Sequence, residues 1–174
     1  MRQIKFRGKS IGTGAWLFGN LFKFGIHPPS NVPCICVCVP KWKDAVDIYN
    51  VHENTVGQFT GLKDKHGNDI YEGDILKVKE YENLSMKHDC DKDREEMRNA
   101  FTLDELKGEV RAEYVSPVCW EEGTFCISTN GDWQHHNDMY LSCLFGDMKC
   151  SMPIFDFEVI GNIIDNPELL TETK

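Results

Sequence analysis

The sequence predicts an all-β protein built as a small closed or partly closed barrel, of the SH3-like or OB-like kind. Short stretches in which apolar and polar residues alternate recur along the chain, as they do in strands with one buried face. Glycines and prolines separate these stretches, which is typical of strands joined by turns. The 174 residues suffice for one hydrophobic core, and no linker divides them. We therefore expect a single domain over residues 1–174.

The first expected element is a β-hairpin near the N-terminus. Ile4 and Phe6 alternate with Lys5 and Arg7, and glycines then flank a second short apolar run at 15–18. Alternation followed by a glycine-rich break predicts two antiparallel strands joined by a turn.

A second expected strand, Pro33–Pro40, is bounded by prolines and rich in β-forming residues, which indicates a position near a sheet edge. A period of two places Cys34, Cys36 and Cys38 on one of its faces. Three thiolates could bind zinc, but their spacing lacks the two-residue spacer of paired zinc knuckles. We therefore predict buried packing of these cysteines, with a metal site as the alternative.

The stretch from Val56 to Ile75 is expected to form a strand, a tight turn and a second strand. Gly67 suits the positive φ that closes a turn, and Gly73 suits a bend that starts the strand at Ile75. Strongly bent barrels use such glycines where strands change direction.

Acidic side chains crowd the same stretch. The candidate binding residues there are Asp64, Asp69, Tyr71, Glu72 and Asp74. Carboxylates that converge would raise one another's pKa, as in acid–base catalysis or metal binding. Asp side chains also cap turns through the nearby backbone, which explains these residues without catalysis. We predict no catalytic residue, and the alternative hypothesis is a carboxylate- or metal-dependent hydrolase that uses this cluster.

A charged segment at 81–107 interrupts the β pattern and is poor in β-branched residues. We expect a short helical insertion around 90–107. Alternatively, the capping-box spacing of Thr102 and Glu105 starts a helix that ends at Gly108.

The β pattern resumes after the insertion. Strands are expected at Gly108–Val115, Gly123–Ser128 and Phe155–Ile164, with a turn at 130–132. Asn166 as N-cap and Pro167 at the first helical position predict a short closing helix.

The composition indicates which cellular compartment and which class of partner to expect. The formal net charge of −9 repels phosphate backbones, so nucleic acid is not the expected partner. Direct DNA binding would need lysines and arginines to gather on one face. The eight cysteines are too few for a disulfide-dense secreted scaffold, and no apolar run is long enough for a signal peptide or a membrane span. We expect reduced thiols, a cytoplasmic protein and no membrane contact.

Several motifs, in order along the chain, resemble the YopX family. They are Arg2–Lys9, Trp16 with Gly19-Asn20, Thr55–Asp64, Ile70–Ile75, Glu158–Ile163 and Asn166–Leu170. The resemblance implies an all-β, barrel-like core and a phage or prophage protein, and it supplies no catalytic residues. This sequence departs from the family pattern in its cysteine content and in the 81–107 insertion.

The resemblance and the composition together predict a phage or prophage accessory protein in the cytoplasm of a bacterial host. We expect it to need no cofactor and to act as a non-catalytic protein-binding or self-assembling module. Its acidic character suggests contact with a host or phage protein through an acidic face.

Overall fold

The computed structural model describes residues 4–23, 33–38, 46–84, 102, 104–121, 123–128, 138–140 and 154–171. The chain divides into two compact units. The N-terminal unit comprises 1–62 and 69–72, and the C-terminal unit comprises 63–68 and 73–174. Each unit carries one antiparallel sheet, so the all-β prediction is confirmed. The expectation of a single domain stays a prediction.

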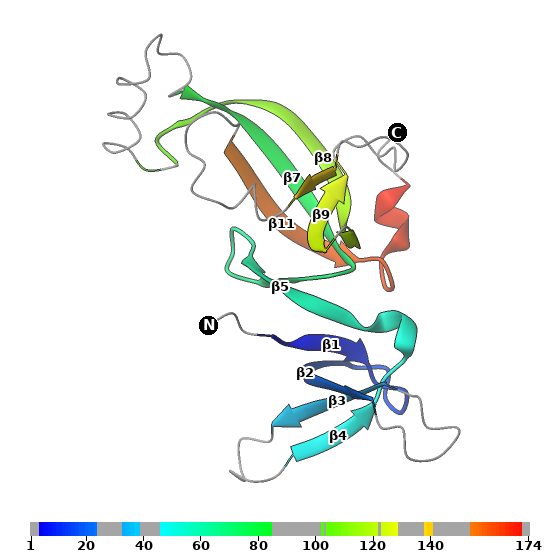
Figure 1. The fold of residues 1–174 in the computed structure, drawn as a ribbon. Helices are drawn as coiled ribbons and strands as arrows, with labels where there is room; N and C mark the ends of the chain where they lie inside the picture. The colour runs from blue at the N-terminus through cyan, green and yellow to red at the C-terminus, as the bar shows by residue number, and fades with distance from the viewer. Residues whose placement is uncertain are drawn as a thin grey trace. The chain divides into compact units, whose positions relative to one another are not determined.

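The first sheet has the strand order β4-β3-β2-β1-β5-β6. Its strands are β1 (Phe6–Lys9), β2 (Trp16–Lys23), β3 (Pro33–Cys38), β4 (Val46–Asn50), β5 (Gly57–Lys63) and β6 (Asp69–Tyr71). β1 and β2 pair antiparallel as the expected hairpin, and β3 and β4 extend the sheet beside them (Figure 1).

The core of the N-terminal unit lies around Ile35, Val51 and Ile70, which are fully buried. Gly8 in β1 faces Val51, and a Cβ at Gly8 would lie 3.0 Å from that side chain. The 3-10 turn Glu53–Thr55 (η1) leads from β4 to β5. In this turn, Oγ1 of Thr55 accepts a hydrogen bond from the backbone N–H of Lys9 at 2.8 Å, which links the turn to β1.

The second sheet has the strand order β10-β9-β8-β7-β11. Its strands are β7 (Asp74–Asn83), β8 (Lys107–Glu121), β9 (Thr124–Ser128), β10 (Asp138–Tyr140) and β11 (Ile154–Asn162). The long strands β7 and β8 run side by side and curve together, with β11 along the other side of β7 (Figure 1). Leu76 and Val78 alternate with lysines along β7 and are fully buried, and Phe157 pairs with Val78. Burying this apolar face is the main source of stability for the sheet.

The predicted barrel is wrong for the residues that the structure describes, because both sheets are open. β4 and β6 are the edges of one sheet, and β10 and β11 are the edges of the other. After the three-residue strand β6, the chain turns at Gly73 (φ +78°) and starts the second sheet with β7. Closure would need the two edge strands of a sheet to pair, and the chain instead changes sheets at this bend.

The helical predictions agree less well with the structure than the strand predictions do. The capping-box contact exists, since the backbone N–H of Thr102 donates to Oε2 of Glu105 at 2.7 Å. It closes a turn rather than a helix, because β8 already begins at Lys107. The expected insertion falls mainly on 85–101, outside the described residues. In the part of the chain that is described, no helix has the length and apolar character needed to cross a membrane.

The closing helix is a single 3-10 turn, Pro167–Leu170 (η3). Pro167 occupies the first turn as predicted, but the side chain of Asn166 makes no cap hydrogen bond. Its Oδ1 instead accepts from the backbone N–H of Asn162 at 3.4 Å. The carboxamide therefore fastens the turn to the end of β11 and is not available to start a longer helix.

Candidate functional site

A cluster of cations and aromatic rings covers one face of the first sheet. We call it the cation–aromatic cluster; its members are Lys5, Arg7, Lys9, Trp16, Phe18, Phe59 and Tyr71. Alternation from Lys5 through Arg7 and Lys9 of β1 sends these three cations to the same face. The register of the hairpin then sets Arg7 opposite Phe18 and Lys9 opposite Trp16.

Arg7 lies at the centre of this cluster and is only 7% exposed. Its guanidinium carbon lies 4.9 Å from the ring centre of Trp16 and 5.2 Å from that of Tyr71. Its Nη2 donates a hydrogen bond to the backbone carbonyl of Glu72 at 3.0 Å. A guanidinium held between rings and removed from water gains more from the ring quadrupoles than an exposed cation does.

Gly57 makes room for this arrangement. A Cβ at Gly57 would lie 2.4 Å from the carbonyl oxygen of Glu72 and 3.5 Å from Nε of Arg7. Any side chain here would therefore push the backbone of Glu72 away from the guanidinium. The glycine allows the turn after β6 to approach β5 closely enough for Arg7 to bind it.

Lys5 joins the cluster from the residue before β1. Its Nζ lies 4.5 Å from the ring centre of Phe59 and forms an ion pair with the carboxylate of Asp69. The hydrogen bond to Asp69 raises the pKa of Lys5, despite the opposing effect of burial. Burial raises the pKa of Tyr71, and the nearby charge of Lys5 opposes that rise. Lys5 therefore stays protonated and Tyr71 stays neutral near neutral pH.

Three large apolar side chains stand exposed on the same sheet face as the cluster. We call Phe18, Phe22 and Ile48 the apolar rim; they are 50%, 45% and 51% exposed. Phe18 and Phe22 share a face of β2 because they are four residues apart in one strand. Asn20, between them, pairs with Cys36, which in turn pairs with Ile48 of β4, so all three rim residues share that face. Phe18 also lies 5.5 Å from the ring of Tyr71, which joins the rim to the cluster.

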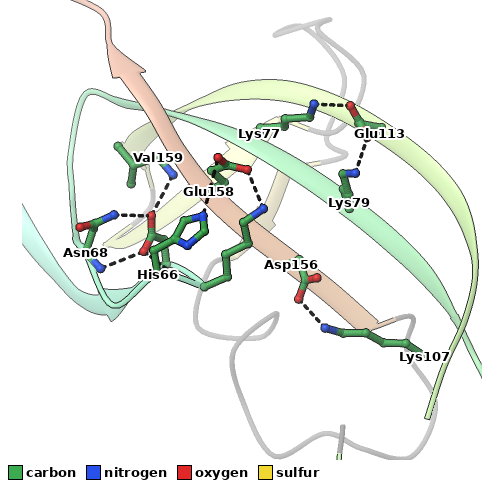
Figure 2. A network of polar contacts seen from close by, with 11 residues as sticks. His66, Asn68, Lys77, Lys79, Lys107, Glu113, Asp156, Glu158 and Val159 are labelled. Carbon is green, nitrogen blue, oxygen red and sulfur yellow. Dashed lines mark hydrogen bonds and ion pairs between the residues drawn. The ribbon is translucent and has the colours of Figure 1, made fainter. Parts of the chain in front are cut away.

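Asp64 organises the turn after β5 in the C-terminal unit. Its Oδ1 accepts from the backbone N–H groups of His66 and Asn68, at 2.9 and 2.8 Å. Its Oδ2 accepts from the Asn68 side chain at 3.0 Å and from the backbone N–H of Val159 in β11 at 3.2 Å (Figure 2). Burial alone would raise the pKa of Asp64, but the hydrogen bonds from Asn68, Val159 and His66 outweigh it and lower the pKa. These contacts support a structural role for Asp64.

Charged side chains cover one face of β7, β8 and β11. We call them the ion-pair layer; they are Lys65, His66, Lys77, Lys79, Lys107, Glu113, Asp156 and Glu158 (Figure 2). Nζ of Lys65 lies 2.6 Å from a carboxylate oxygen of Glu158. In β7, Nζ of Lys77 and Nζ of Lys79 lie 2.6 and 3.1 Å from the carboxylate oxygens of Glu113 in β8. The hydrogen bonds from these lysines lower the pKa of Glu158 and of Glu113. Opposite charges on neighbouring strands thus meet in pairs across the sheet.

The predicted acidic candidates divide between the two units. Asp69, Tyr71 and Glu72 belong to the N-terminal unit, whereas Asp64 and Asp74 belong to the C-terminal unit. The structure brings Asp69 and Tyr71 together around Lys5. Glu72 contributes its backbone carbonyl to Arg7, and Asp74 is buried at the start of β7. The hydrolase hypothesis and the assignment of these residues as binding residues stay predictions.

The predicted metal candidates are described in part. Cys34 is buried in β3, and its Sγ lies 3.1 Å from Oδ1 of Asn50. The side chains of Cys36 and Cys38 lie outside the described part of the structure. Within the described ranges, no three His, Cys, Asp or Glu side chains are grouped so that they could hold a metal ion.

Sequence reasoning missed most of the cation–aromatic cluster. It identified Tyr71 and Asp69 but not Arg7, Trp16 or Phe59, although all three lie in or beside the motifs that resemble the YopX family. The usable signal was the alternation of the cations Lys5, Arg7 and Lys9 in and just before β1. Their aromatic neighbours come from three other strands, and only the register between strands reveals that they meet.

Over the residues that the structure describes, the chain is an all-β protein with two open antiparallel sheets. The profile of the YopX protein family matches residues 5–171, and the chain therefore belongs to the YopX family. The structure is also similar to the crystal structure of protein EF1440 from Enterococcus faecalis, with 21% sequence identity and a TM-score of 0.44. That match covers 98% of this chain and 99% of EF1440. A search of curated proteins found no match.

Proposed function

We propose that this protein is a non-catalytic phage or prophage accessory protein that binds another protein through the apolar rim. The observation that carries the proposal is the gathering of Phe18, Phe22 and Ile48 on one sheet face, each about half exposed. Single exposed apolar residues are ordinary on protein surfaces, but several on one face mark an interaction surface.

The neighbourhood of the rim supports a protein partner. Aromatic side chains and arginine are enriched in protein interfaces and supply most of the binding energy there. Here Phe18 packs on Tyr71, which in turn lies against Arg7, so the rim rests on side chains that are already held in place. A surface that is ordered before binding loses less conformational entropy when a partner arrives.

Nucleic acid is the less suitable partner for this face, although cations and rings lie together on it. Binding of a phosphate backbone depends on cations that can exchange their counterions. Arg7 instead binds the carbonyl of Glu72, and Lys5 pairs with Asp69. The net charge of −9 adds a long-range repulsion.

The partner we propose is a protein segment with apolar side chains, in the cytoplasm of a bacterial host. A second copy of this chain is the first partner to test, because purified protein is sufficient. The module needs no cofactor for this role, and residues 1–174 act in it as one domain.

The test is sedimentation velocity of the full chain over a wide concentration range, followed by capture from a lysate of a bacterial host. The variant Phe18→Ser/Phe22→Ser removes the two aromatic side chains of the rim, and Val110→Ser/Ile163→Ser removes two exposed apolar residues from the C-terminal unit as a matched control. We expect an association or a captured protein that the rim variant loses and the control retains. A monomer that captures nothing, or captures the same proteins with both variants, would contradict the proposal.

A further inference from the structure

Two cysteines face each other in the hairpin of β8 and β9. Cys119 in β8 pairs directly with Cys126 in β9, and their Sγ atoms lie 3.1 Å apart. Sγ of Cys119 also lies 3.6 Å from the carbonyl oxygen of Cys126, and Sγ of Cys126 lies 3.8 Å from that of Cys119. The two thiols are therefore each other's immediate neighbours.

The surrounding hairpin holds the two cysteines in register. Trp120 and Phe125, the next pair toward the turn, meet edge to face with ring centres 4.6 Å apart. On the other side, Val118 in β8 pairs with Ile127 in β9. Contacts on both sides thus keep β8 and β9 aligned at the cysteines.

The backbone geometry suits a disulfide. Directly opposed residues of antiparallel strands have Cα atoms about 4.5–5.5 Å apart. This spacing falls within the range of roughly 4.4–6.8 Å that disulfides span. The two Sγ atoms need only a small further approach, which side-chain rotation can supply. No rearrangement of the strands is required.

The two thiols differ in access to solvent. Cys126 is fully buried, whereas Cys119 is partly exposed. A thiol must meet the oxidant as a thiolate, and access to solvent favours that reaction. Cys119 is therefore the residue that an oxidant meets first, and Cys126 is placed to resolve the product.

We propose that Cys119 and Cys126 form a reversible dithiol–disulfide pair, a modification site that is independent of the apolar rim. The oxidant is a low-molecular-weight disulfide such as oxidised glutathione. The Cys119 thiolate attacks one sulfur of this disulfide, forms a mixed disulfide and releases one glutathione thiolate. The Cys126 thiolate then attacks Sγ of Cys119, forms the intramolecular disulfide and releases the second glutathione. Two protein thiols are oxidised, and one glutathione disulfide is reduced to two thiols.

The new bond changes the hairpin more than the rest of the sheet. It closes a short loop around the turn at Gly123, which has a φ of +85°. Cross-linking restricts the opened and unfolded states of the enclosed segment. Amides in β9 and at the end of β8 are therefore expected to exchange with solvent more slowly in the oxidised protein.

The experiment uses the full chain, reduced and then treated with oxidised glutathione. Remaining thiols are alkylated, and digested peptides are identified by mass spectrometry. We expect a peptide that links Cys119 to Cys126, its loss after a dithiol reductant, and slower hydrogen exchange in the hairpin. In Cys126→Ser, glutathione should stay attached to Cys119, whereas Cys34→Ser should form the linked peptide as the wild type does.

Separate alkylation of both cysteines in the oxidised wild type would overturn the proposal. So would a stable glutathione adduct on Cys119 in the wild type, or disulfides that join either residue to another cysteine. The wild-type measurement decides the question even if a serine variant does not fold.

Discussion

The two sheets use alternating cations in opposite ways. In the N-terminal unit, Arg7 is buried between Trp16 and Tyr71 and donates to a backbone carbonyl. In the C-terminal unit, Lys77 and Lys79 remain at the surface and share one carboxylate. The local sequence pattern is the same, since a cation occurs at every second position of β1 and of the middle of β7. The neighbouring strands decide whether a ring or a carboxylate lies opposite.

This difference has an energetic consequence. A desolvated guanidinium that loses its partners leaves buried polar atoms unsatisfied, which is costly. An exposed ion pair gains little, because water and salt screen it. The cation–aromatic cluster should therefore stabilise its sheet strongly, while the ion-pair layer mainly sets the charge of its surface.

Replacing Asp64 should have the largest effect. Asp64→Ala leaves the N–H groups of His66, Asn68 and Val159 without their acceptor and should cost about 3 kcal/mol of unfolding free energy. Urea denaturation monitored by tryptophan fluorescence measures this loss. Asp104→Ala is the matched control, because Asp104 is an exposed acid of the same unit that pairs with Lys107. Equal losses in the two variants would refute the structural role of Asp64.

The contribution of Asp64 should also depend on pH. Its folded pKa lies below its unfolded value, so the stabilisation is fully present above the unfolded pKa, about 3.9. It is lost as the pH falls through the lower, folded pKa, because protonation weakens the hydrogen bonds to the carboxylate. Wild-type stability should therefore fall more steeply than that of Asp64→Asn below about pH 4. Parallel pH profiles would contradict this assignment.

Adding a side chain at Gly57 should have the second-largest effect on stability. Gly57→Ala places a Cβ against the carbonyl of Glu72 and should cost about 2 kcal/mol, because backbone must move to relieve the overlap. Gly12→Ala is the control, since a Cβ there would meet only Oγ of Ser10, at 3.9 Å. Thermal unfolding of both variants measures the difference. A Gly57→Ala protein as stable as Gly12→Ala would show that Arg7 does not require the close approach.

Arg7→Lys tests the cluster itself and should cost about 1–2 kcal/mol, because a lysine keeps the charge but loses the contacts of the guanidinium with the two rings. Trp16 and Tyr71 would both lose their guanidinium contact, and the emission of Trp16 should change. Arg111→Lys is the control, because Arg111 is half exposed and lies 3.4 Å from Glu82. Urea denaturation compares the two. If Arg7→Lys is as stable as the wild type, the proposed difference between the cations of the two sheets is wrong.

Changing the ion-pair layer should have the smallest effect. Glu158→Gln removes the pairs with Lys65 and His66, both of which are screened by solvent. The small loss should vanish at high salt. The folded pKa of Glu158 is lowered, so its contribution is present above the unfolded pKa and disappears as the pH falls through the folded pKa. A loss as large as that of Arg7→Lys, or one insensitive to salt, would contradict the account.

Local sequence signals predicted much of the fold. Alternation located the strands, and Gly67 adopts the predicted positive φ. The chain turns at Gly73, where a bend was predicted. The helical predictions rested on local cues as well, but β8 begins within the expected helix, at Lys107. A capping box signals a helix only where helical residues follow, and here the strand pairing of β8 takes precedence over that cue.

The sites were less predictable because they depend on pairing between distant segments. Asp64 reaches Val159 in β11, and Lys5 reaches Asp69 in β6. No spacing rule connects such residues, since register is set by the whole sheet. The same holds at shorter range for Cys119 and Cys126, whose separation of seven residues suggests no contact until a hairpin places them opposite each other.

We propose that the apolar rim of the N-terminal unit is a contact surface. Hydroxyl-radical footprinting of the full chain tests it directly, in dilute solution, at high concentration and in an extract of a bacterial host. We predict that Phe18 and Phe22 are oxidised more slowly at high concentration or in the extract than in dilute solution, whereas Val110 of the other unit is oxidised equally in all three. Equal oxidation of Phe18 and Phe22 under all three conditions would contradict the account.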